Sequence, residues 1–497
     1  MNTTQASFEP IASERFAPRR STEDPRLLVM SNRAPVRVIH EKGQQRIETT
    51  VGGVGSTFMR LLERHGGVWI AWSGARANPG RLTMAGAESR FSMVFPRISE
   101  RDISSYYYGM CNRALWPLMH FMTLNCRFDT EQWNSYRVVN RIFAKAAEAE
   151  VSECDAVWVQ DFHLALVPAL LRERNRALPI GLFWHVPWPP EQMFRIFPWR
   201  SELLTGMLGS DLIGFHTPAY VKHFLDGCER ILGCEVNRET GDVFHDSRTT
   251  RVGAFPLGIA ADRFRELSAS APVRARARRI RKAIGTPMVV LGVDRLDYTK
   301  GIAERLLGFE RFLELNPRYR RRITMILIAV PSRSRVAEYV ALKKYIDELV
   351  GRVVGRFSSG GWVPIRYLYT QFPTEELVAY YQAADIALVT PLRDGMNLVA
   401  KEYVASHLGD AGVLILSEFA GAAQELKSAL SVNPYDIDLI ATALKTAMEM
   451  PVEERRARLA ELRQNVEHNN LDAWSEKYLA ALFKASNIRR DATLSPN

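Results

Sequence analysis

The chain has 497 residues, with 65 Lys and Arg against 55 Asp and Glu, a formal net charge of +10 and five cysteines. At roughly 150 residues per domain, this length predicts two to four domains. The longest apolar run, residues 323–331, is too short for a membrane span, which needs about 20 residues. The odd cysteine count without a C-x-x-C motif argues against a disulfide scaffold or a zinc knuckle, so we expect a cytoplasmic protein.

The net charge of +10 is the one unusual number in the composition. Nucleic acid, an anionic membrane surface and small polyanionic substrates are all partners that would suit a basic protein. Composition alone does not choose among these three classes.

In chain order, a disordered lead-in over residues 1–26 is predicted first, because it mixes charges, Ser, Thr and Pro without an apolar segment. Short apolar runs then alternate with helical patterns, which predicts an α/β protein with parallel sheets. The predicted strands are residues 27–31, 68–72, 156–159, 180–184, 212–215, 288–293, 323–329, 386–390 and 413–416. The predicted helices include residues 303–315, 335–350 and 374–383, and the tail from 451 to 484 is helical in pattern.

A domain boundary is expected near residues 258–287, where a strand-like segment gives way to a basic helix and then to a new strand. The prediction is two doubly wound Rossmann-like domains that face each other across a cleft. Ligands of such sheets bind beyond the carboxyl ends of the strands, so the cleft is the expected active site. The predicted division is 1–26 lead-in, 27–260 first domain, 261–465 second domain and 466–497 tail.

The strongest chemical signal is Thr390-Pro-Leu-Arg-Asp-Gly-Met-Asn-Leu-Val-Ala-Lys-Glu402, which follows an apolar strand and opens a helix. Backbone N–H groups of Asn397 and Leu398 then lie at a helix N-terminus, which favours a phosphate. Carboxylates at Asp394 and Glu402 suit sugar and ribose hydroxyl groups. A capped helix in an α/β core remains the plain alternative.

The second segment, Asp294-Arg-Leu-Asp-Tyr-Thr-Lys-Gly301, begins where another strand ends. Its Arg295 and Lys300 suit a diphosphate, because Arg offers a planar fork and Lys a mobile point charge. A surface salt-bridge group is the plain alternative. In the first half, weaker signals are Ser31-Asn-Arg33, Gly52-Gly53, three tyrosines at 106–108, and the histidines of Asp161-Phe-His163 and Trp184-His185.

Together these segments resemble the trehalose-6-phosphate synthase family of retaining glycosyltransferases, from about residue 27 to residue 482. The segments 294–301 and 391–402 are highly specific in combination, and residues 112–117, 211–216 and 416–423 match as well. The resemblance implies the GT-B fold, with two Rossmann-like domains and a terminal helix that crosses back to the first domain. It also implies transfer of glucose from UDP-glucose to glucose 6-phosphate, the first step of trehalose biosynthesis.

The resemblance also implies site roles, position by position. For the donor, it implies that Arg295 and Lys300 bind the diphosphate and that Glu402 binds the ribose. Asp394 would bind the glucosyl hydroxyls and the diphosphate, together with the backbone of Met396, Asn397 and Leu398. Gly53 would let a loop close over the donor, and His185 and Asp161 would contact the sugars near the reacting centre. The pocket for the acceptor's 6-phosphate would be formed by Arg33, Tyr107, Trp116 and Arg333.

In mechanism, the resemblance implies front-face transfer, in which the acceptor hydroxyl approaches on the side that UDP leaves. Arg295 and Lys300 would stabilise the leaving diphosphate in place of a metal, so no metal and no cofactor are expected. Asp436-Ile-Asp438 has the spacing of a metal-bound nucleotide loop, but it is predicted to cap a helix. The chain offers no length for a fused phosphatase, so a separate trehalose-6-phosphate phosphatase is expected in the pathway, and we also expect a homo-oligomer.

Three alternatives stay open at this stage. A glucosylglycerol-phosphate synthase would share the fold and use glycerol 3-phosphate as its acceptor, while a regulatory pseudo-enzyme would lack a central residue. A nucleic-acid binder would use the basic run at residues 274–282, although no aromatic side chains are interleaved with it. The expected partners are therefore the two sugar substrates, with no nucleic acid and no membrane, and the donor base (UDP, GDP or ADP) is left open.

Overall fold

The structure is a computed structural model of the whole chain. It describes residues 25–34, 36–41, 44–49, 54–74, 78–85, 90–333, 336–409 and 412–494. Gly53 and nearly all of the predicted lead-in lie outside the described residues.

The first half is built on a ten-stranded sheet in the order β10-β11-β12-β9-β8-β7-β1-β4-β6-β5. Its central strands are parallel, and antiparallel pairs occur only at its two edges among the described strands. The strands are β1 (Leu27–Arg33), β4 (Gly67–Trp72), β5 (Arg81–Ala85), β6 (Arg90–Val94), β7 (Ala156–Gln160), β8 (Ile180–Phe183), β9 (Leu212–Phe215), β10 (Glu235–Asn237), β11 (Asp242–His245) and β12 (Arg248–Ala254). A separate hairpin pairs β2 (Val36–Glu41) with β3 (Gln44–Thr49).

The second half has a six-stranded sheet in the order β15-β14-β13-β16-β17-β18, in which every pair is parallel. The strands are β13 (Met288–Arg295), β14 (Ile323–Val330), β15 (Ile365–Leu368), β16 (Ile386–Val389), β17 (Val413–Ser417) and β18 (Leu430–Val432). This order reverses between β13 and β16, as in a doubly wound nucleotide-binding sheet. In the first sheet, the equivalent reversal lies between β1 and β7.

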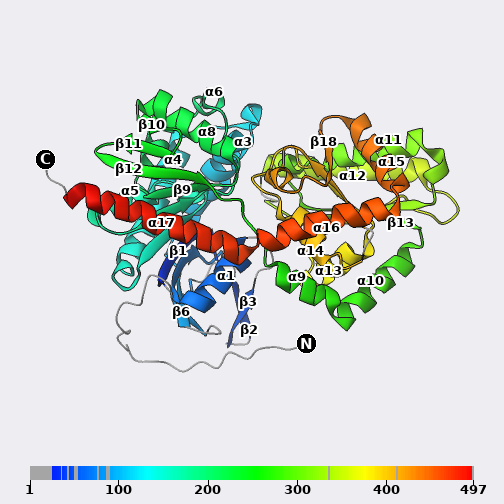
Figure 1. The fold of residues 1–497 in the computed structure, drawn as a ribbon, viewed down its shortest axis with the longest axis horizontal. Coiled ribbons are helices and arrows are strands. Elements are labelled where there is room, and N and C mark those ends of the chain that lie inside the picture. The colour runs from blue at the N-terminus through cyan, green and yellow to red at the C-terminus, as the bar shows by residue number, and fades with distance from the viewer. Residues whose placement is uncertain are drawn as a thin grey trace.

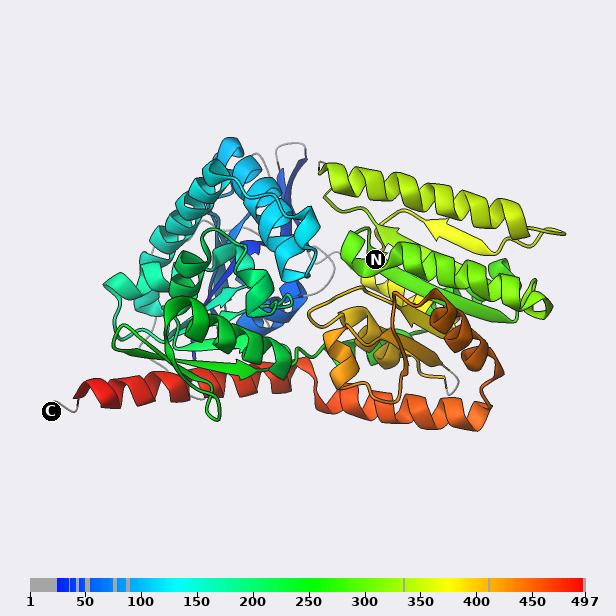
Figure 2. The same ribbon diagram turned by 90° about the horizontal axis from the view of Figure 1, so that it is seen from above.

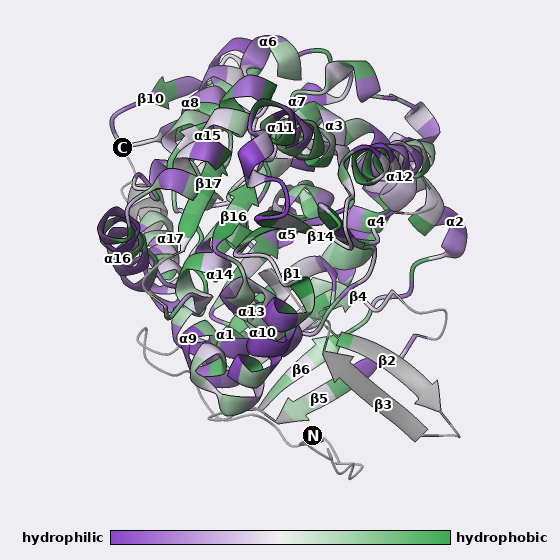
Figure 3. Ribbon diagram, turned by 90° about the vertical axis from the view of Figure 1, so that its right-hand side faces the viewer, coloured by the Kyte–Doolittle hydropathy of each residue, from purple (hydrophilic) through white to green (hydrophobic). Residues whose placement is uncertain are grey.

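Helices cover both faces of each sheet, and Figures 1 and 2 show the two layered halves side by side. The α-helices of the first half are α1 (Val54–His65), α2 (Glu100–Ile103), α3 (Trp116–Met119), α4 (Thr130–Glu148), α5 (Val167–Arg174), α6 (Glu191–Phe194), α7 (Arg200–Met207) and α8 (Pro218–Gly227). Those of the second half are α9 (Ala261–Ala269), α10 (Ala271–Ile284), α11 (Ile302–Leu315), α12 (Ala337–Phe357), α13 (Thr374–Ala383), α14 (Leu398–Ser406), α15 (Ile437–Glu449) and α16 (Val452–His468), and α17 (Leu471–Leu494) follows. In Figure 3 the inner strands β16 and β17 are hydrophobic and the outer α16 is largely hydrophilic, as two-sided burial of the sheet requires.

The last helix, α17, leaves the second half and packs against the first sheet (Figure 1). Tyr478 stacks on Trp158 of β7 with 4.4 Å between ring centroids, and Trp474 lies edge-on to Phe58 of α1. These rings belong to one buried cluster on that face of the first sheet. The crossing helix predicted from the family resemblance is therefore confirmed.

The predicted strands are present as β1, β4, β7, β8, β9, β13, β14, β16 and β17, with small differences at their ends. The predicted helix 335–350 corresponds to α12, which begins at Ala337 and continues to Phe357. The helical tail is two helices, α16 and α17, which pack on different halves. The α/β class with two doubly wound sheets is confirmed, and the division at residues 260/261 and 465/466 stays a prediction.

Candidate active site

The candidate site lies where the carboxyl ends of the central strands of both sheets approach each other. Arg295 ends β13, and Asp394 follows β16. In the first half, Arg33 ends β1 and Asp161 follows β7. These four strands flank the points at which the strand order reverses in each sheet, which is where doubly wound sheets bind ligands.

Aromatic and charged side chains join the two halves at this position. Trp116, which begins α3 in the first half, donates from Nε1 to Asp297 Oδ1 of the second half over 3.4 Å. The guanidinium carbon of Arg333 lies 4.0 Å from the centroid of the same indole, and that of Arg295 lies 5.4 Å from it. Cation–π contact therefore places two cations of the second half on one ring of the first.

The backbones of the two halves also meet closely at Gly395. A Cβ atom at this position would lie 2.1 Å from the carbonyl oxygen of His185, a separation that only glycine avoids. Beside it, the Tyr220 hydroxyl donates to the carbonyl oxygen of Asp394 over 3.3 Å. The turn between β16 and α14 is therefore held directly against the strand ends of the first half.

On the predicted donor side, Lys300 and Asp394 form a nearly buried ion pair. Asn397 donates from Nδ2 to the same Asp394 oxygen over 3.0 Å. Burial alone would raise the pKa of Asp394, but the Lys300 charge and hydrogen bond hold it below its ordinary value. The carboxylate that the sequence predicts to bind glucosyl hydroxyls is therefore ionised and oriented by two neighbours.

Arg295 differs from Lys300 in its partners. It is exposed, it makes no ion pair with any described residue, and its guanidinium lies over the ring of Trp116. At the start of α14, Asn397 is the N-cap in a left-handed conformation with φ 67°. The N-terminus of α14 and the unpaired Arg295 together form an anion-binding arrangement of the kind predicted for a diphosphate.

Glu402 lies in α14, behind this turn. Its Oε2 accepts a 2.8 Å hydrogen bond from the Tyr381 hydroxyl. Burial raises the pKa of Glu402. Met396 is buried, and its carbonyl oxygen already accepts from the Ala422 N–H over 2.9 Å. The ribose role of Glu402 and the diphosphate role of the Met396 backbone stay predictions.

On the predicted acceptor side, Arg333 is almost fully buried, and its Nη1 donates to Asp297 Oδ2 over 2.7 Å. Its Nε is buried without a hydrogen-bond partner. Burial opposes the charge, but the neighbouring Tyr339 and Asp297 hold the pKa of Arg333 above its ordinary value. A buried guanidinium with an unmet donor is an arrangement that an anionic ligand would complete.

Arg33 lies on a second aromatic platform formed by Trp72 and Tyr107. Its guanidinium carbon is 4.7 Å from the Trp72 centroid and 5.6 Å from the Tyr107 centroid. Tyr107 belongs to η1 (Ser104–Leu115), a π-helix, which is a rare conformation that is often found at functional sites. All four residues predicted for the acceptor phosphate therefore lie on two adjoining cation–π clusters.

His185 and Asp161 lie next to each other in the first half, as the Asp161 carboxylate accepts from the His185 backbone N–H over 3.2 Å. The His185 Nε2 is 2.8 Å from Gln160 Oε1, an acceptor, so Nε2 carries the proton and Nδ1 has a free lone pair. Nδ1 is buried without a partner, and burial lowers the pKa of His185 well below its ordinary value. Burial raises the pKa of Asp161 to about 6.

Two residues at the site carry no role in the sequence-based prediction. His163 stacks between Tyr107 and Phe162, with centroids 6.1 Å and 3.9 Å away. Burial, and then the charges of Arg333, Arg33 and Arg295, lower the pKa of His163 to about 3. The other residue is Asp297, whose position inside the segment 294–301 was the only available signal.

Strained backbone conformations occur at three of the predicted site residues. Among the described non-glycine residues with positive φ are Asp161 (69°), Arg333 (45°) and Asn397 (67°), all of them predicted site residues. Such conformations persist where the surrounding structure enforces them, and they cluster at functional sites.

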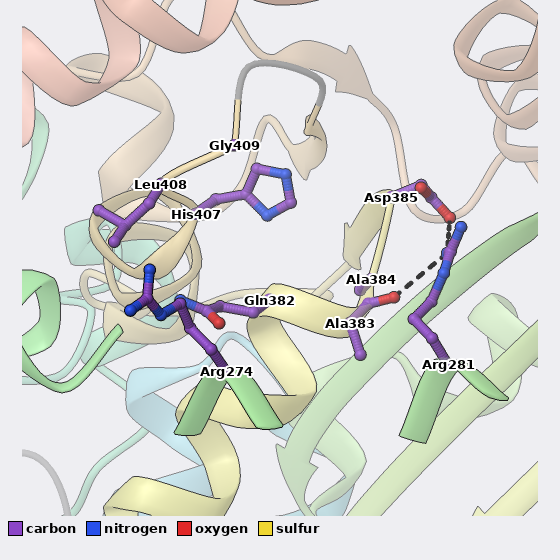
Figure 4. A pocket seen from close by; sticks show the side chains of 9 residues that line it. All are labelled: Arg274, Arg281, Gln382, Ala383, Ala384, Asp385, His407, Leu408 and Gly409. Carbon is purple, nitrogen blue, oxygen red and sulfur yellow. Dashed lines mark hydrogen bonds and ion pairs between the residues drawn. The ribbon is translucent and has the colours of Figure 1, made fainter. Parts of the chain in front are cut away.

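The structure also contains a cavity of about 490 Å³ at the opposite end of the second sheet, beside the start of β16 (Figure 4). It is lined by α10, the end of α13 and the segment after α14, and it contains no predicted site residue. Arg281 in its wall is paired with Asp385 and also donates to the Ala383 carbonyl over 3.3 Å. We therefore assign this arginine to capping α13.

Among the described residues, no three His, Cys, Asp or Glu side chains are grouped as ligands for a metal ion. Asp436 is the N-cap of α15 and accepts from the Leu439 N–H over 2.9 Å, so its predicted capping role is confirmed. The five cysteines form no disulfide. Of the described helices, none has the length and apolar character that a membrane crossing needs.

Comparison with known proteins is consistent with this geometry. Residues 25–484 match the model of glycosyltransferase family 20. Trehalose-6-phosphate synthase of Mycolicibacterium vanbaalenii is 40% identical over 467 residues, which cover 92% of this chain and 95% of that protein.

Solved structures give the same result. The alpha,alpha-trehalose-phosphate synthase (UDP-forming) of Burkholderia xenovorans in complex with glucose-6-phosphate superposes with a TM-score of 0.84 at 33% identity, over 92% of this chain and 99% of that one. A trehalose-6-phosphate structure from E. coli bound with UDP-2-fluoro glucose has a TM-score of 0.84 at 32% identity, over 92% and 98%. The chain belongs to glycosyltransferase family 20.

Proposed function

We propose that this protein transfers glucose from UDP-glucose to glucose 6-phosphate with retention of configuration, which yields trehalose 6-phosphate and UDP. One observation carries the proposal: the unpaired Arg295 and the buried Arg333 lie over the same Trp116 ring. Two phosphate-bearing substrates that react with each other need their anionic groups bound a short distance apart. The relatives solved with glucose-6-phosphate and with UDP-2-fluoro glucose support this choice of substrates.

The donor is bound mainly by the second half in this proposal. Arg295 and Lys300 hold the diphosphate, together with backbone N–H groups at Met396 to Leu398. Glu402 accepts from the ribose, and Asp394 accepts from the glucosyl hydroxyls. Gly53, which lies outside the described residues, is proposed to belong to the loop that covers the donor.

The acceptor is bound between the halves. Arg33 and Arg333 take its 6-phosphate, with Tyr107 and Trp116 as the flat surfaces that hold the two guanidinium groups. The free Nδ1 of His185 accepts from a sugar hydroxyl, since its other nitrogen is occupied by Gln160. Asp161 accepts from a second hydroxyl near the reacting carbon.

Catalysis follows from positioning and from charge stabilisation. The acceptor hydroxyl attacks the anomeric carbon on the face that UDP leaves, and its proton passes to a leaving phosphate oxygen. Arg295 and Lys300 stabilise the charge that grows on the departing diphosphate. The proposal needs no metal and no other cofactor for this step.

The wider context is also proposed. The product leaves with its phosphate, so a separate phosphatase is required to release trehalose. We further propose a cytoplasmic homo-oligomer.

The decisive experiment offers the purified protein UDP-glucose with either glucose 6-phosphate or glycerol 3-phosphate. Mass spectrometry identifies the product, and proton NMR of the new anomeric linkage reports whether configuration is retained. We expect a disaccharide phosphate with an α-linkage from glucose 6-phosphate alone. Product from glycerol 3-phosphate alone, or an inverted linkage, would overturn the proposal. Parallel reactions with GDP-glucose and ADP-glucose test the donor base.

A further inference from the structure

Asp297 is the most heavily bonded carboxylate of the candidate site, and it is fully buried. Its Oδ2 accepts from Arg333 Nη1 over 2.7 Å and from the Tyr339 hydroxyl over 2.9 Å. Its Oδ1 accepts from the backbone N–H and the hydroxyl of Thr299, both over 3.0 Å, and from Trp116 Nε1 over 3.4 Å. Five donors from three segments of the chain therefore converge on one side chain.

The location of these donors explains what the carboxylate does. Thr299 is local, since Asp297 caps the short 3-10 helix η6 (Tyr298–Lys300). Arg333 and Tyr339 come from beyond β14, and Trp116 comes from the first half of the molecule. Asp297 is thus a buried anion that bridges the two halves and the strand ends that carry the phosphate-binding cations.

The geometry of Arg333 shows which of its edges is left for a ligand. Nη1 is occupied by Asp297 and by the Tyr339 hydroxyl. The buried Nε has no partner, and Nε lies on the edge of the guanidinium that matches a phosphate with two parallel donors. Rotation of the group is further restricted by its 4.0 Å contact with the Trp116 ring.

The charge state of Asp297 is secured by its surroundings. Burial by itself would raise the pKa of Asp297, but the charges of Arg333, Arg295 and Lys300 hold it well below its ordinary value. The side chain is therefore ionised at neutral pH and accepts from all five donors.

We propose that Asp297 is a positioning residue for the acceptor: it holds Arg333 flat on Trp116 with the Nε edge turned toward the 6-phosphate, and it assembles this pocket only when the two halves meet. The inference deepens the proposed function and rests on it. Asp297 does not touch the substrate. It acts through Arg333 and Trp116, which do.

Three possible roles of Asp297 predict different changes in ligand affinity for the substitution Asp297→Asn. As a positioning residue, it affects glucose 6-phosphate alone, because Arg333 loses its orientation. As a mere negative charge beside three cations, its loss would tighten both phosphate ligands by removing repulsion. As a mere structural residue, its loss would weaken glucose 6-phosphate and UDP together.

The test is isothermal titration of D297N with glucose 6-phosphate and, separately, with UDP. We expect glucose 6-phosphate to bind ~10-fold more weakly, which does not exceed the loss expected when Arg333 itself is removed, and UDP to bind no more weakly than to wild type. Equal weakening of both ligands, or tightening of both, overturns the inference. Wild-type protein that fails to bind glucose 6-phosphate at all would instead overturn the proposed function.

Asp294→Asn is the matched control. Asp294 lies in the same segment, is also buried and pairs with an arginine, Arg305, over 2.5 Å, but Arg333 is not among its partners. D294N should leave the ratio of the two affinities unchanged. A selective loss of glucose 6-phosphate in D294N would contradict the assignment to Asp297.

A double-mutant cycle shows whether Asp297 acts through Arg333. The variant D297N/R333A should bind glucose 6-phosphate within twofold of R333A, because the positioning residue has nothing left to position. If the affinity losses of the two single variants multiply in the double variant, the inference is overturned. If D297N does not fold, Tyr339→Phe takes its place: it removes one hydroxyl from the same network and should weaken glucose 6-phosphate about two- to fivefold, and an unchanged affinity would overturn the inference.

Discussion

The two halves share a sheet plan but present different chemistry at their strand ends. Both sheets reverse their strand order at the centre, at β1/β7 in one and at β13/β16 in the other. The second half contributes three cations, Arg295, Lys300 and Arg333, at or after its strand ends. The first half contributes Arg33, neutral histidines and aromatic rings. The second half therefore carries most of the cations of the candidate site, and the first half carries most of its aromatic rings.

The cations themselves form two classes. Lys300 and Arg333 are each paired with a buried carboxylate, Asp394 and Asp297. Arg295 and Arg33 lie against aromatic rings instead. A paired cation is held in a defined direction, whereas an unpaired one keeps its full charge available for a ligand. Substitutions in the two classes should accordingly affect binding and turnover differently.

The largest effect is expected where the halves touch. Gly395→Ala would place a methyl group 2.1 Å from the His185 carbonyl oxygen, so the halves would have to separate. We expect turnover to fall about 100-fold, which corresponds to ~2.7 kcal/mol of transition-state stabilisation, while thermal unfolding stays close to wild type. Gly355→Ala is the control, since its Cβ would meet nothing within 4 Å in α12, and it should leave turnover unchanged.

Arg295→Ala tests the unpaired cation of the second half. In the proposed mechanism its contact with the diphosphate strengthens as UDP departs, so its loss should remove ~1.5–3 kcal/mol and lower the turnover number ~10- to 100-fold. Steady-state kinetics at saturating substrates measures this. A turnover number within twofold of wild type would remove Arg295 from the mechanism.

Arg333→Ala tests the paired cation that faces the acceptor. We expect glucose 6-phosphate to bind ~10- to 50-fold more weakly, because a buried charge-assisted contact is lost, and UDP affinity to be unchanged. Titration with each ligand separates the two affinities. An equal loss for both ligands would contradict the assignment of Arg333 to the acceptor phosphate.

The smallest expected effect is a pH dependence from the first half. Burial raises the pKa of Asp161 to about 6, so the carboxylate is ionised at pH 7 and largely protonated at pH 5. Since the ionised form accepts a sugar hydroxyl in the proposed mechanism, kcat/KM for the acceptor should fall about tenfold from pH 7 to pH 5. The variant Asp161→Asn should be slower at pH 7 and should keep only the dependence that comes from titration of the substrate phosphate. An identical profile in both proteins would contradict this role.

Much of the fold could be predicted from the sequence, because each inner strand is buried on both faces and therefore appears as an uninterrupted apolar run. The edge strands β5, β10, β15 and β18 lack such a run, and none of them was predicted from the sequence. The helix α4 was not predicted either. Candidate site residues are easiest to name from the sequence in the second half, where Arg295, Lys300 and Asp394 lie in two short segments that follow strands. In the first half, the contacts join residues far apart in the chain, so spacing alone could not rank His163 against His185.

The sequence by itself determined the two doubly wound halves, since the buried strands follow from local apolar patterns. It also determined which residue types stand at the strand ends, since these lie in short segments that directly follow the strands. Only the tertiary structure decided which charge is paired with which. Asp297 is two residues from Arg295 and three from Lys300, yet its ion-pair partner is Arg333, and Trp116 reaches it from the other half. Burial makes the difference, because a carboxylate removed from water must collect its donors from whatever segments the fold brings within hydrogen-bond distance.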